Sequence, residues 1–486
     1  MNKHQAFQEG RYTGILLHLS SLPGPMANGT MGEDAVRFMR WLQGIGASVW
    51  QILPIGPTDA NGSPYSLLSA FAGNPTYINQ EGPWGSHGDL MRLSRSCHSL
   101  DSMVELLASS LDSPADEQWK TAYFEFVSKN TYWIDDYALY DVIRKETEKP
   151  WYSWPEKLKY RDVVELDHYA STRMEGITAV KLLQFLFYVQ WSCLKTCAEE
   201  HALKIYGDIP IFCSYDSADV WSHPEYFMLD ANGELLELTG VPPDAFSETG
   251  QLWGGPQYNW EQLEKDGYAW WVKRIEVALG YYDFMRIDHF RGLESYWVVP
   301  AGSENAVNGY WRKGPGAKLF DAIDHALGPV PFIAEDLGVI TPEVDALRRQ
   351  LGMPGMRVLQ FNFDGDPENP HSFINHTKDS VVYTGTHDND TLMGWWADLS
   401  DEEKVLVVQG VPRPELNMPW SVIDCALQSK GFLAIVPMQD LLGLGSEARM
   451  NTPGQAYGNW RWRFQWPDVP EDLGEKITGL IQQARR

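Results

Sequence analysis

The sequence contains few cysteines, and their placement argues against a disulfide framework. Five cysteines are spread over 486 residues, and an odd, scattered set is not typical of disulfide-stabilised secreted domains. Cys193, Cys197 and His201 follow at four-residue spacing, which would place them on one helical face. The outer two would lie about 12 Å apart along the axis, too far for one ion to bind all three. We therefore expect packing rather than a metal site.

Basic charge is also scarce. Lys and Arg number 39 against 65 Asp and Glu, a net charge of −26. Because polyanions repel such a chain, we expect neither nucleic acid nor an anionic membrane surface as a partner. The charge identifies no substrate, and solubility is its simplest explanation.

Long apolar runs are missing as well. No run approaches the roughly 18 residues of a membrane span. The segment Ile15–Leu19 is too short and too interrupted for a signal-peptide core. No heptad pattern or evident apolar patch indicates assembly. The sequence predicts a cytoplasmic protein that is not associated with membranes, with a monomer as the default.

Aromatic residues, in contrast, are plentiful. The chain has 21 tryptophans and 22 tyrosines. Aromatic faces suit the C–H faces of sugar rings, but they also fill large cores. Composition alone is therefore only a hint of sugar binding.

Strand-like apolar runs alternate with helix-length segments, which is typical of a parallel sheet. Eight such strands fit the α/β class as a (β/α)₈ barrel better than an open sheet. Pro331 leaves the start of the fifth strand uncertain. The expected strands are Gly14–Leu19, Ser48–Leu53, Lys204–Ile209, Tyr281–Ile287, Val330–Ala334, Met356–Phe361, Ser380–Thr384 and Phe432–Val436.

The spacing of these strands is uneven. We expect one catalytic domain over residues 1–486, with insertions at about 60–200 after the second strand and about 212–278 after the third. The first insertion includes an amphipathic helix at Thr178–Glu200. Insertions in βα loops build the substrate cleft of barrel enzymes. After the eighth strand we expect only a helix near Leu473–Ala484, with no β-sandwich.

Three of the expected strands lead into carboxylates. In Phe284–Asp288 the period of two places Arg286 and Asp288 on one face, where the arginine keeps the carboxylate ionised. Glu335 follows the fifth strand, and Asp388 follows the seventh after Gly385, Thr386 and His387. Acids at the carboxyl ends of barrel strands indicate an active site.

Two carboxyl groups can cleave a glycosidic bond. In a retaining enzyme one attacks the anomeric carbon, and the other first donates and then accepts a proton. Asp288 suits the nucleophile, which needs a low pKa, and Glu335 suits the acid/base, which needs a raised one. Asp388 would brace the sugar hydroxyls and the positive charge of the transition state, and His387 would bind a hydroxyl. We predict a separation of about 5–5.5 Å between the two carboxyl groups.

Each signal has a simpler explanation. Arg286 and Asp288 are also the residues of a structural ion pair. Glu335 and Asp336 suit a helix N-terminus, and residues 385–390 suit a capped turn or a cation loop. Only their order and their common placement at strand ends favour catalysis.

Several segments together resemble amylomaltase, the 4-α-glucanotransferases of family 77 of the glycoside hydrolases, within the α-amylase clan. The resemblance covers nearly the whole chain. Its segments are residues 14–24, 63–65, 207–211, 240–244, 247–254, 284–292, 333–338, 383–389, 450–454 and 459–463.

The resemblance implies a barrel with inserted subdomains and no metal or organic cofactor. It implies malto-oligosaccharides and α-1,4-glucans as substrates, with residues 242–255 forming a loop over the cleft. Longer relatives carry an amino-terminal extension, and a starch- or glycogen-binding role tied to it is not expected here. By the same likeness Asp288, Glu335 and Asp388 are catalytic, Tyr65, Asp208, Arg286 and His387 line the donor site, and His289, Trp253 and Asn459 lie near the acceptor side or the cleft edge.

Three functions remain open from the sequence. Transfer of α-1,4-glucan segments between malto-oligosaccharides is favoured. A hydrolase of the same clan comes second, because the catalytic trio is shared. A non-catalytic glucan-binding protein is the remote third, because binding alone does not require two carboxyl groups opposed across a bond.

Overall fold

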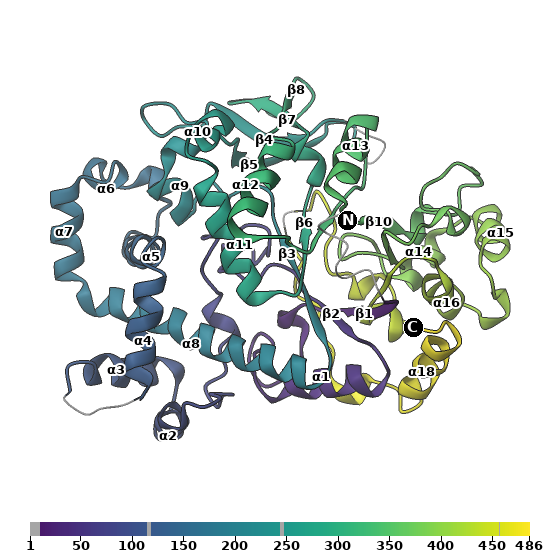
Figure 1. The fold of residues 1–486 in the computed structure, drawn as a ribbon, viewed down its shortest axis with the longest axis horizontal. Helices are drawn as coiled ribbons and strands as arrows, with labels where there is room; N and C mark the ends of the chain where they lie inside the picture. Colours follow the sequence, from purple (N-terminus) through teal and green to yellow (C-terminus); the bar gives the residue numbers. More distant parts are fainter. Residues whose placement is uncertain (1–9, 114–117, 244–246, 456) are drawn as a thin grey trace.

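The computed structural model describes residues 10–113, 118–243, 247–455 and 457–486. Its centre is a sheet of eight parallel strands (Figure 1). In spatial order they are β10 (Gly355–Val358), β11 (Ser380–Tyr383), β12 (Leu433–Pro437), β1 (Tyr12–Leu16), β2 (Val49–Gln51), β3 (Lys204–Ile209), β6 (Phe284–Ile287) and β9 (Phe332–Ala334).

The two outer strands of this order, β9 and β10, meet and nearly close the sheet. The N–H of Ala334 donates to the carbonyl of Pro354 over 2.9 Å. The expected (β/α)₈ barrel is thus confirmed.

Alternate residues of each strand face the barrel interior or the surrounding helices. In β6, Phe284 belongs to the inner core and Met285 to the outer core. Arg286 therefore points inward with Phe284, and Met285 points away from the site, as the sequence indicates. The same period carries Asp288 to the inner face at the end of the strand.

The expected strands overlap the observed ones, and β3 agrees at both ends. The strand bounds differ by at most three residues. Strand β6 begins at Phe284 rather than Tyr281 because helix α11 (Ala269–Tyr281) continues up to the strand, and β1 and β10 end three residues earlier than expected. The final expected helix is α18 (Leu473–Gln483).

Helices dominate the segment between β2 and β3. Its helices are α2 (Gly88–Ser96), α3 (Leu100–Ser110), α4 (Gln118–Lys129), α5 (Ile134–Thr147), α6 (Glu156–Lys159), α7 (Val163–Thr172) and α8 (Met174–Glu200). Figure 1 shows α8 running from this group to the foot of the barrel near α1 (Glu33–Gly44).

Helix α8 corrects one sequence expectation. By length and composition alone it is long and apolar enough to span a membrane, with a mean hydropathy of 1.3 over its 18-residue window. Polar residues interrupt this run, so the sequence shows no continuous apolar segment of that length there. In the fold, 56% of that window is buried, and α8 packs against α3, α4, α5 and β3, as a core helix does.

A second, antiparallel sheet was not expected. It has the order β5 (Gln251–Pro256), β4 (Glu237–Val241), β7 (Ser295–Pro300) and β8 (Tyr310–Lys313). Strands β4 and β5 precede β6 in the chain, and β7 and β8 follow it. The expected insertion at about 212–278 therefore contains only half of this sheet.

The remaining helices surround the barrel or join its strands. They are α9 (Ala218–Ser222), α10 (Trp260–Lys265), α12 (Ala317–Leu327), α13 (Pro342–Leu351), α14 (Leu392–Asp398), α15 (Asp401–Gly410), α16 (Trp420–Gln428) and α17 (Met438–Leu441).

Candidate active site

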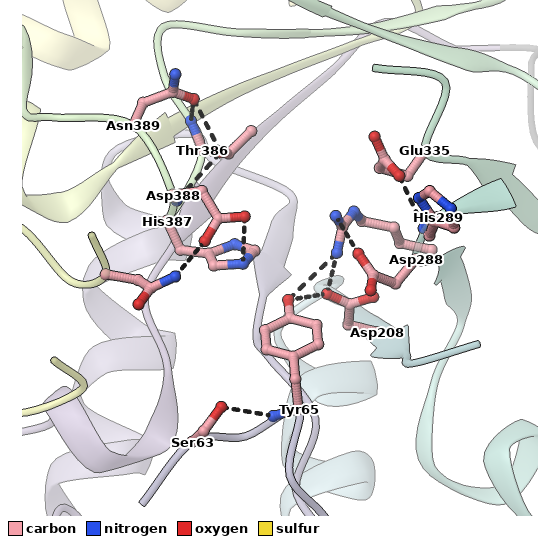
Figure 2. A network of polar contacts seen from close by, with 12 residues as sticks. Ser63, Tyr65, Asp208, Asp288, His289, Glu335, Thr386, His387, Asp388 and Asn389 are labelled. Carbon is pink, nitrogen blue, oxygen red and sulfur yellow. Dashed lines mark hydrogen bonds and ion pairs between the residues drawn. The ribbon is translucent and has the colours of Figure 1, made fainter. Parts of the chain in front are cut away.

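A polar network lies at the carboxyl ends of β3 and β6, and Figure 2 shows its members Tyr65, Asp208 and Asp288. Arg286 is buried and contacts all three of them. The two strands are paired so that Asp208 lies opposite Arg286. The Arg286 guanidinium forms an ion pair with Asp208 through Nη1 and another with Asp288 Oδ1 through Nη2, the latter at 2.8 Å. Tyr65 joins from the segment after β2, since its hydroxyl donates to Asp208 Oδ2 over 2.6 Å. Four of the expected site residues are thus in direct contact.

Glu335 is held by backbone donors rather than by a charged side chain. The N–H of His289 donates to Oε2 over 2.7 Å, and the N–H of Leu337 donates to Oε1 over 2.9 Å. His289 has a left-handed backbone (φ +50°), a conformation uncommon outside glycine but one that histidine adopts more often than most residues. This turn directly follows Asp288, so the nucleophile candidate and the acid/base candidate are connected through one peptide bond and one hydrogen bond.

Asp388 lies across the site at the end of β11 (Figure 2). Its Oδ2 is 3.4 Å from His387 Nε2, and its Oδ1 accepts a hydrogen bond from Asn451 Nδ2 over 2.6 Å. The side chain of Asn389 caps the turn by accepting from the N–H of Thr386 over 2.9 Å. Within the described ranges no cluster of three or more His, Cys, Asp or Glu residues suits a metal ion.

Burial and charge separate the two carboxyl groups chemically. Burial, assisted by the charge of Asp288, raises the pKa of Glu335 to about 8, although Arg286 opposes the shift. Burial also raises the pKa of Asp288 to about 6; Arg286 opposes this shift, while Asp208 and Asp388 add to it. The low pKa expected for Asp288 is therefore wrong, because burial outweighs the arginine. The order is nevertheless the required one: near neutral pH Glu335 is protonated while most Asp288 is ionised.

Aromatic rings form one wall of the site. The ring of Tyr65 stacks on that of His387, with centroids 5.3 Å apart and planes at 15°. Trp460 lies 5.9 Å from both rings. Burial lowers the pKa of His387, so the stacked imidazole is neutral near pH 7. Aromatic rings beside carboxylates suit a sugar ring.

The three residues expected at the acceptor side have different surroundings. Trp253, on β5, is 42% exposed and meets the His289 ring edge-on at 4.9 Å. The side chain of Asn459 is bonded within its own loop, since it accepts from the N–H of Thr452 over 3.0 Å and donates to Gln455. A direct sugar contact by any of the three stays a prediction. Residues 244–246 of the expected cleft loop, 242–255, lie outside the described residues.

Two contributors to the site were missed. Asn451 and Trp460 both belong to segments that carry the resemblance, 450–454 and 459–463, yet received no role. Only their proximity in the fold shows that they contact Asp388 and Tyr65.

An eight-stranded parallel barrel with two carboxyl groups of separated pKa, an arginine between acids and an aromatic wall defines an enzyme acting on glycosidic bonds. Comparison with known proteins narrows this class. A family model described as 4-alpha-glucanotransferase, of glycoside hydrolase family 77, matches residues 17–468.

Full-length relatives agree with the family model. The chain is 41% identical to the 4-alpha-glucanotransferase of Thermus thermophilus, with 98% of this chain and 99% of that protein covered. It is 42% identical to the 4-alpha-glucanotransferase of Synechocystis, with 97% and 96% covered. Among solved structures, the amylomaltase of Streptococcus agalactiae in complex with acarbose superposes with a TM-score of 0.88 at 32% identity, covering 98% of this chain and 99% of that one. The chain belongs to glycoside hydrolase family 77, the 4-alpha-glucanotransferases.

Proposed function

We propose that the protein transfers α-1,4-glucan segments between malto-oligosaccharides, so that two chains of equal length become one longer and one shorter chain. The observation that carries this proposal is the buried Asp288–Glu335 pair, in which the pKa of Glu335 lies above that of Asp288. The relatives with full-length coverage are 4-alpha-glucanotransferases, which supports transfer.

The test is incubation of the purified protein with maltotriose alone, with free glucose and chain length followed together. Glucose with a ladder of longer oligosaccharides is expected. Glucose and maltose with nothing longer than the trimer would instead identify a hydrolase. No reaction at all would favour a binding protein or indicate that a longer donor is required.

The reaction proceeds in two displacements. Ionised Asp288 attacks the anomeric carbon while Glu335 gives its proton to the departing glycosidic oxygen, so the C–O bond breaks as the ester bond forms. The fragment that carries the new 4-hydroxyl leaves. Glu335, now ionised, removes the proton from the 4-hydroxyl of an incoming glucan, whose oxygen displaces Asp288. Two inversions retain the α configuration.

The surrounding residues prepare this chemistry. Arg286 holds Asp288 Oδ1, so the other oxygen is the one that attacks. Asp208 and Tyr65 hold Arg286 from the far side, which fixes the guanidinium against the strand. Asp388 and His387 bind hydroxyls of the same sugar ring, and Asp388 stabilises the positive charge that develops on it.

Transfer must compete with attack by water, because water is always present. An acceptor sugar that is bound and oriented next to the ester reacts faster than a diffusing water molecule. Trp253 is suited to bind that acceptor, because it is exposed and its ring contacts His289, the neighbour of Asp288.

The two other functions are less well supported. The relatives do not favour the hydrolase. A purely binding role leaves unexplained why two carboxyl groups with separated pKa values share one buried site.

The setting of the protein is a proposal as well. We infer a cytoplasmic monomer that binds neither membranes nor nucleic acid. The net charge of −26 supports the last point, and the five free cysteines suit a reducing compartment. Cell fractionation and light scattering coupled to size-exclusion chromatography test compartment and oligomeric state.

A further inference from the structure

We infer that Asn451 is a positioning residue for the reaction: its side-chain amide holds Oδ1 of the Asp388 carboxylate so that the other oxygen, Oδ2, and the negative charge face the sugar. This inference rests on the role proposed above for Asp388. Its first support is the hydrogen bond from Asn451 Nδ2 to Asp388 Oδ1, at 2.6 Å.

Asn451 is itself held firmly to the turn that carries Asp388. The N–H of Asn451 donates to the carbonyl of His387 over 3.1 Å. Arg449 bridges the same two segments, because Nη2 donates to the Asp388 carbonyl over 2.6 Å and Nε to the Asn451 carbonyl over 2.7 Å. These three hydrogen bonds hold the backbone of Asn451 beside that of His387 and Asp388 independently of the Asn451 side chain.

Asp388 depends on a hydrogen bond that fixes its side chain more than the other acids of the site do. Its side chain is 44% exposed, against 28% for Asp288 and none for Asp208. An exposed aspartate exchanges rotamers readily. A fixed carboxylate, in contrast, costs no reorganisation when charge develops in the transition state.

The Asn451 amide is also an uncharged donor, which affects the charge that Asp388 presents to the sugar. Arg286 partly neutralises Asp208 and Asp288. In the described part of the chain the ion-pair contact of Asp388 is to His387, whose pKa burial lowers. The nearby cation, Arg449, donates to the backbone carbonyl of Asp388 instead. An amide donor therefore orients Asp388 and leaves its negative charge available to the cationic sugar.

The experiment compares Asn451→Leu, which keeps the size and removes the donor, with Ser446→Ala as a matched control. Ser446 also donates to a nearby carboxylate, Asp390 Oδ2, over 2.6 Å. Steady-state disproportionation of maltotriose gives kcat and KM. Inhibition by acarbose, a cationic transition-state mimic, is compared with binding of neutral maltotetraose.

For Asn451→Leu we expect kcat to fall by about 10- to 100-fold, the range for loss of a hydrogen bond to a charged group, while KM changes little. Acarbose affinity should fall more than maltotetraose affinity. Ser446→Ala should keep the wild-type kcat, KM and affinities.

An unchanged kcat in Asn451→Leu would overturn the inference. So would equal losses of acarbose and maltotetraose affinity, which would indicate general damage to the site. Asp388→Asn, assayed in parallel, separates this failure from that of the proposed function. If Asp388→Asn is inactive while Asn451→Leu is fully active, only the role of Asn451 fails; if Asp388→Asn keeps full activity, the role of Asp388 fails first.

Discussion

The backbone N–H of His289 donates to Glu335 Oε2 over 2.7 Å, so the residue that follows Asp288 in the chain holds the second carboxyl group of the site. The left-handed turn at His289 thereby connects the two groups, by the peptide bond to Asp288 on one side and the hydrogen bond to Glu335 on the other. Their relative position depends on one peptide and one hydrogen bond, which makes the pair sensitive to substitution at either end.

Replacing Asp288 by Asn should abolish turnover and spare binding. The amide has nearly the shape of the carboxylate but cannot form the glycosyl ester, so we expect kcat to fall by at least about 1000-fold. Acarbose binding, measured by calorimetry, should persist. Substantial residual transfer would contradict the assignment of Asp288 as nucleophile.

The pH dependence of kcat/KM should be bell-shaped. Protonation of Asp288 removes the nucleophile below about pH 6, and deprotonation of Glu335 removes the acid above about pH 8. Initial rates on maltotriose from pH 4.5 to 9.5 measure both limbs.

Glu335→Gln should remove the alkaline limb and lower kcat about 100- to 10,000-fold on maltotriose, the usual contribution of a general acid. A donor with a good leaving group, such as α-maltosyl fluoride, does not need the acid, so its first step should be much less affected. Equal losses on both donors would contradict the assignment.

Trp253→Ala should lower the ratio of transfer to hydrolysis by roughly 3- to 10-fold, for loss of an aromatic contact of about 0.5–1.5 kcal/mol. Trp311→Ala is a matched control: Trp311 is 41% exposed, lies on β8 of the same sheet and stacks on Arg291. The ratio comes from free glucose against longer oligosaccharides. An unchanged ratio in Trp253→Ala would exclude this residue from acceptor selection.

Asp440 should make the fold less stable as pH rises. Burial raises its pKa to about 7, against the hydrogen bonds from the Leu392 N–H and the Thr384 hydroxyl. Between about pH 4 and pH 7 the folded state keeps a proton on Asp440 that the unfolded state has lost. The stability that the protonated Asp440 contributes is therefore complete below about pH 4, declines between pH 4 and 7, and is absent above pH 7. Asp440→Asn, which keeps both partners, should flatten the difference in melting temperature between pH 5 and pH 8. An undiminished difference would assign it to other groups.

The sequence predicted the barrel because its signals are local. Each central strand is a short apolar run, and the acids that end β6, β9 and β11 could be read directly from the residues that follow those runs. Two strands of the small sheet, β4 and β5, gave no such signal. Strand β4 contains Thr239 and Gly240, and β5 contains Gly254 and Gly255; glycine is depleted in strands, so neither segment was recognised.

The site was predicted by residue type but not by environment. Arg286 beside Asp288 suggested a depressed carboxyl pKa, yet the sequence does not reveal how deeply both are buried, and burial proved the larger effect. Asn451 was missed for a related reason: its partner, Asp388, is far away in the chain, and only the closed barrel brings the two segments together.

The second sheet draws strands from both sides of β6, and the chain passes from Asp288 through His289 and the short helix Phe290–Leu293 directly into β7. The second sheet and Asp288, one of the two reacting carboxyl groups, are therefore consecutive parts of one polypeptide segment. Exchanging the β7–β8 hairpin to alter acceptor choice would also shift the backbone at His289, whose N–H donates to Glu335. Acceptor selectivity and proton transfer should then vary together among engineered hairpins instead of being adjustable one at a time.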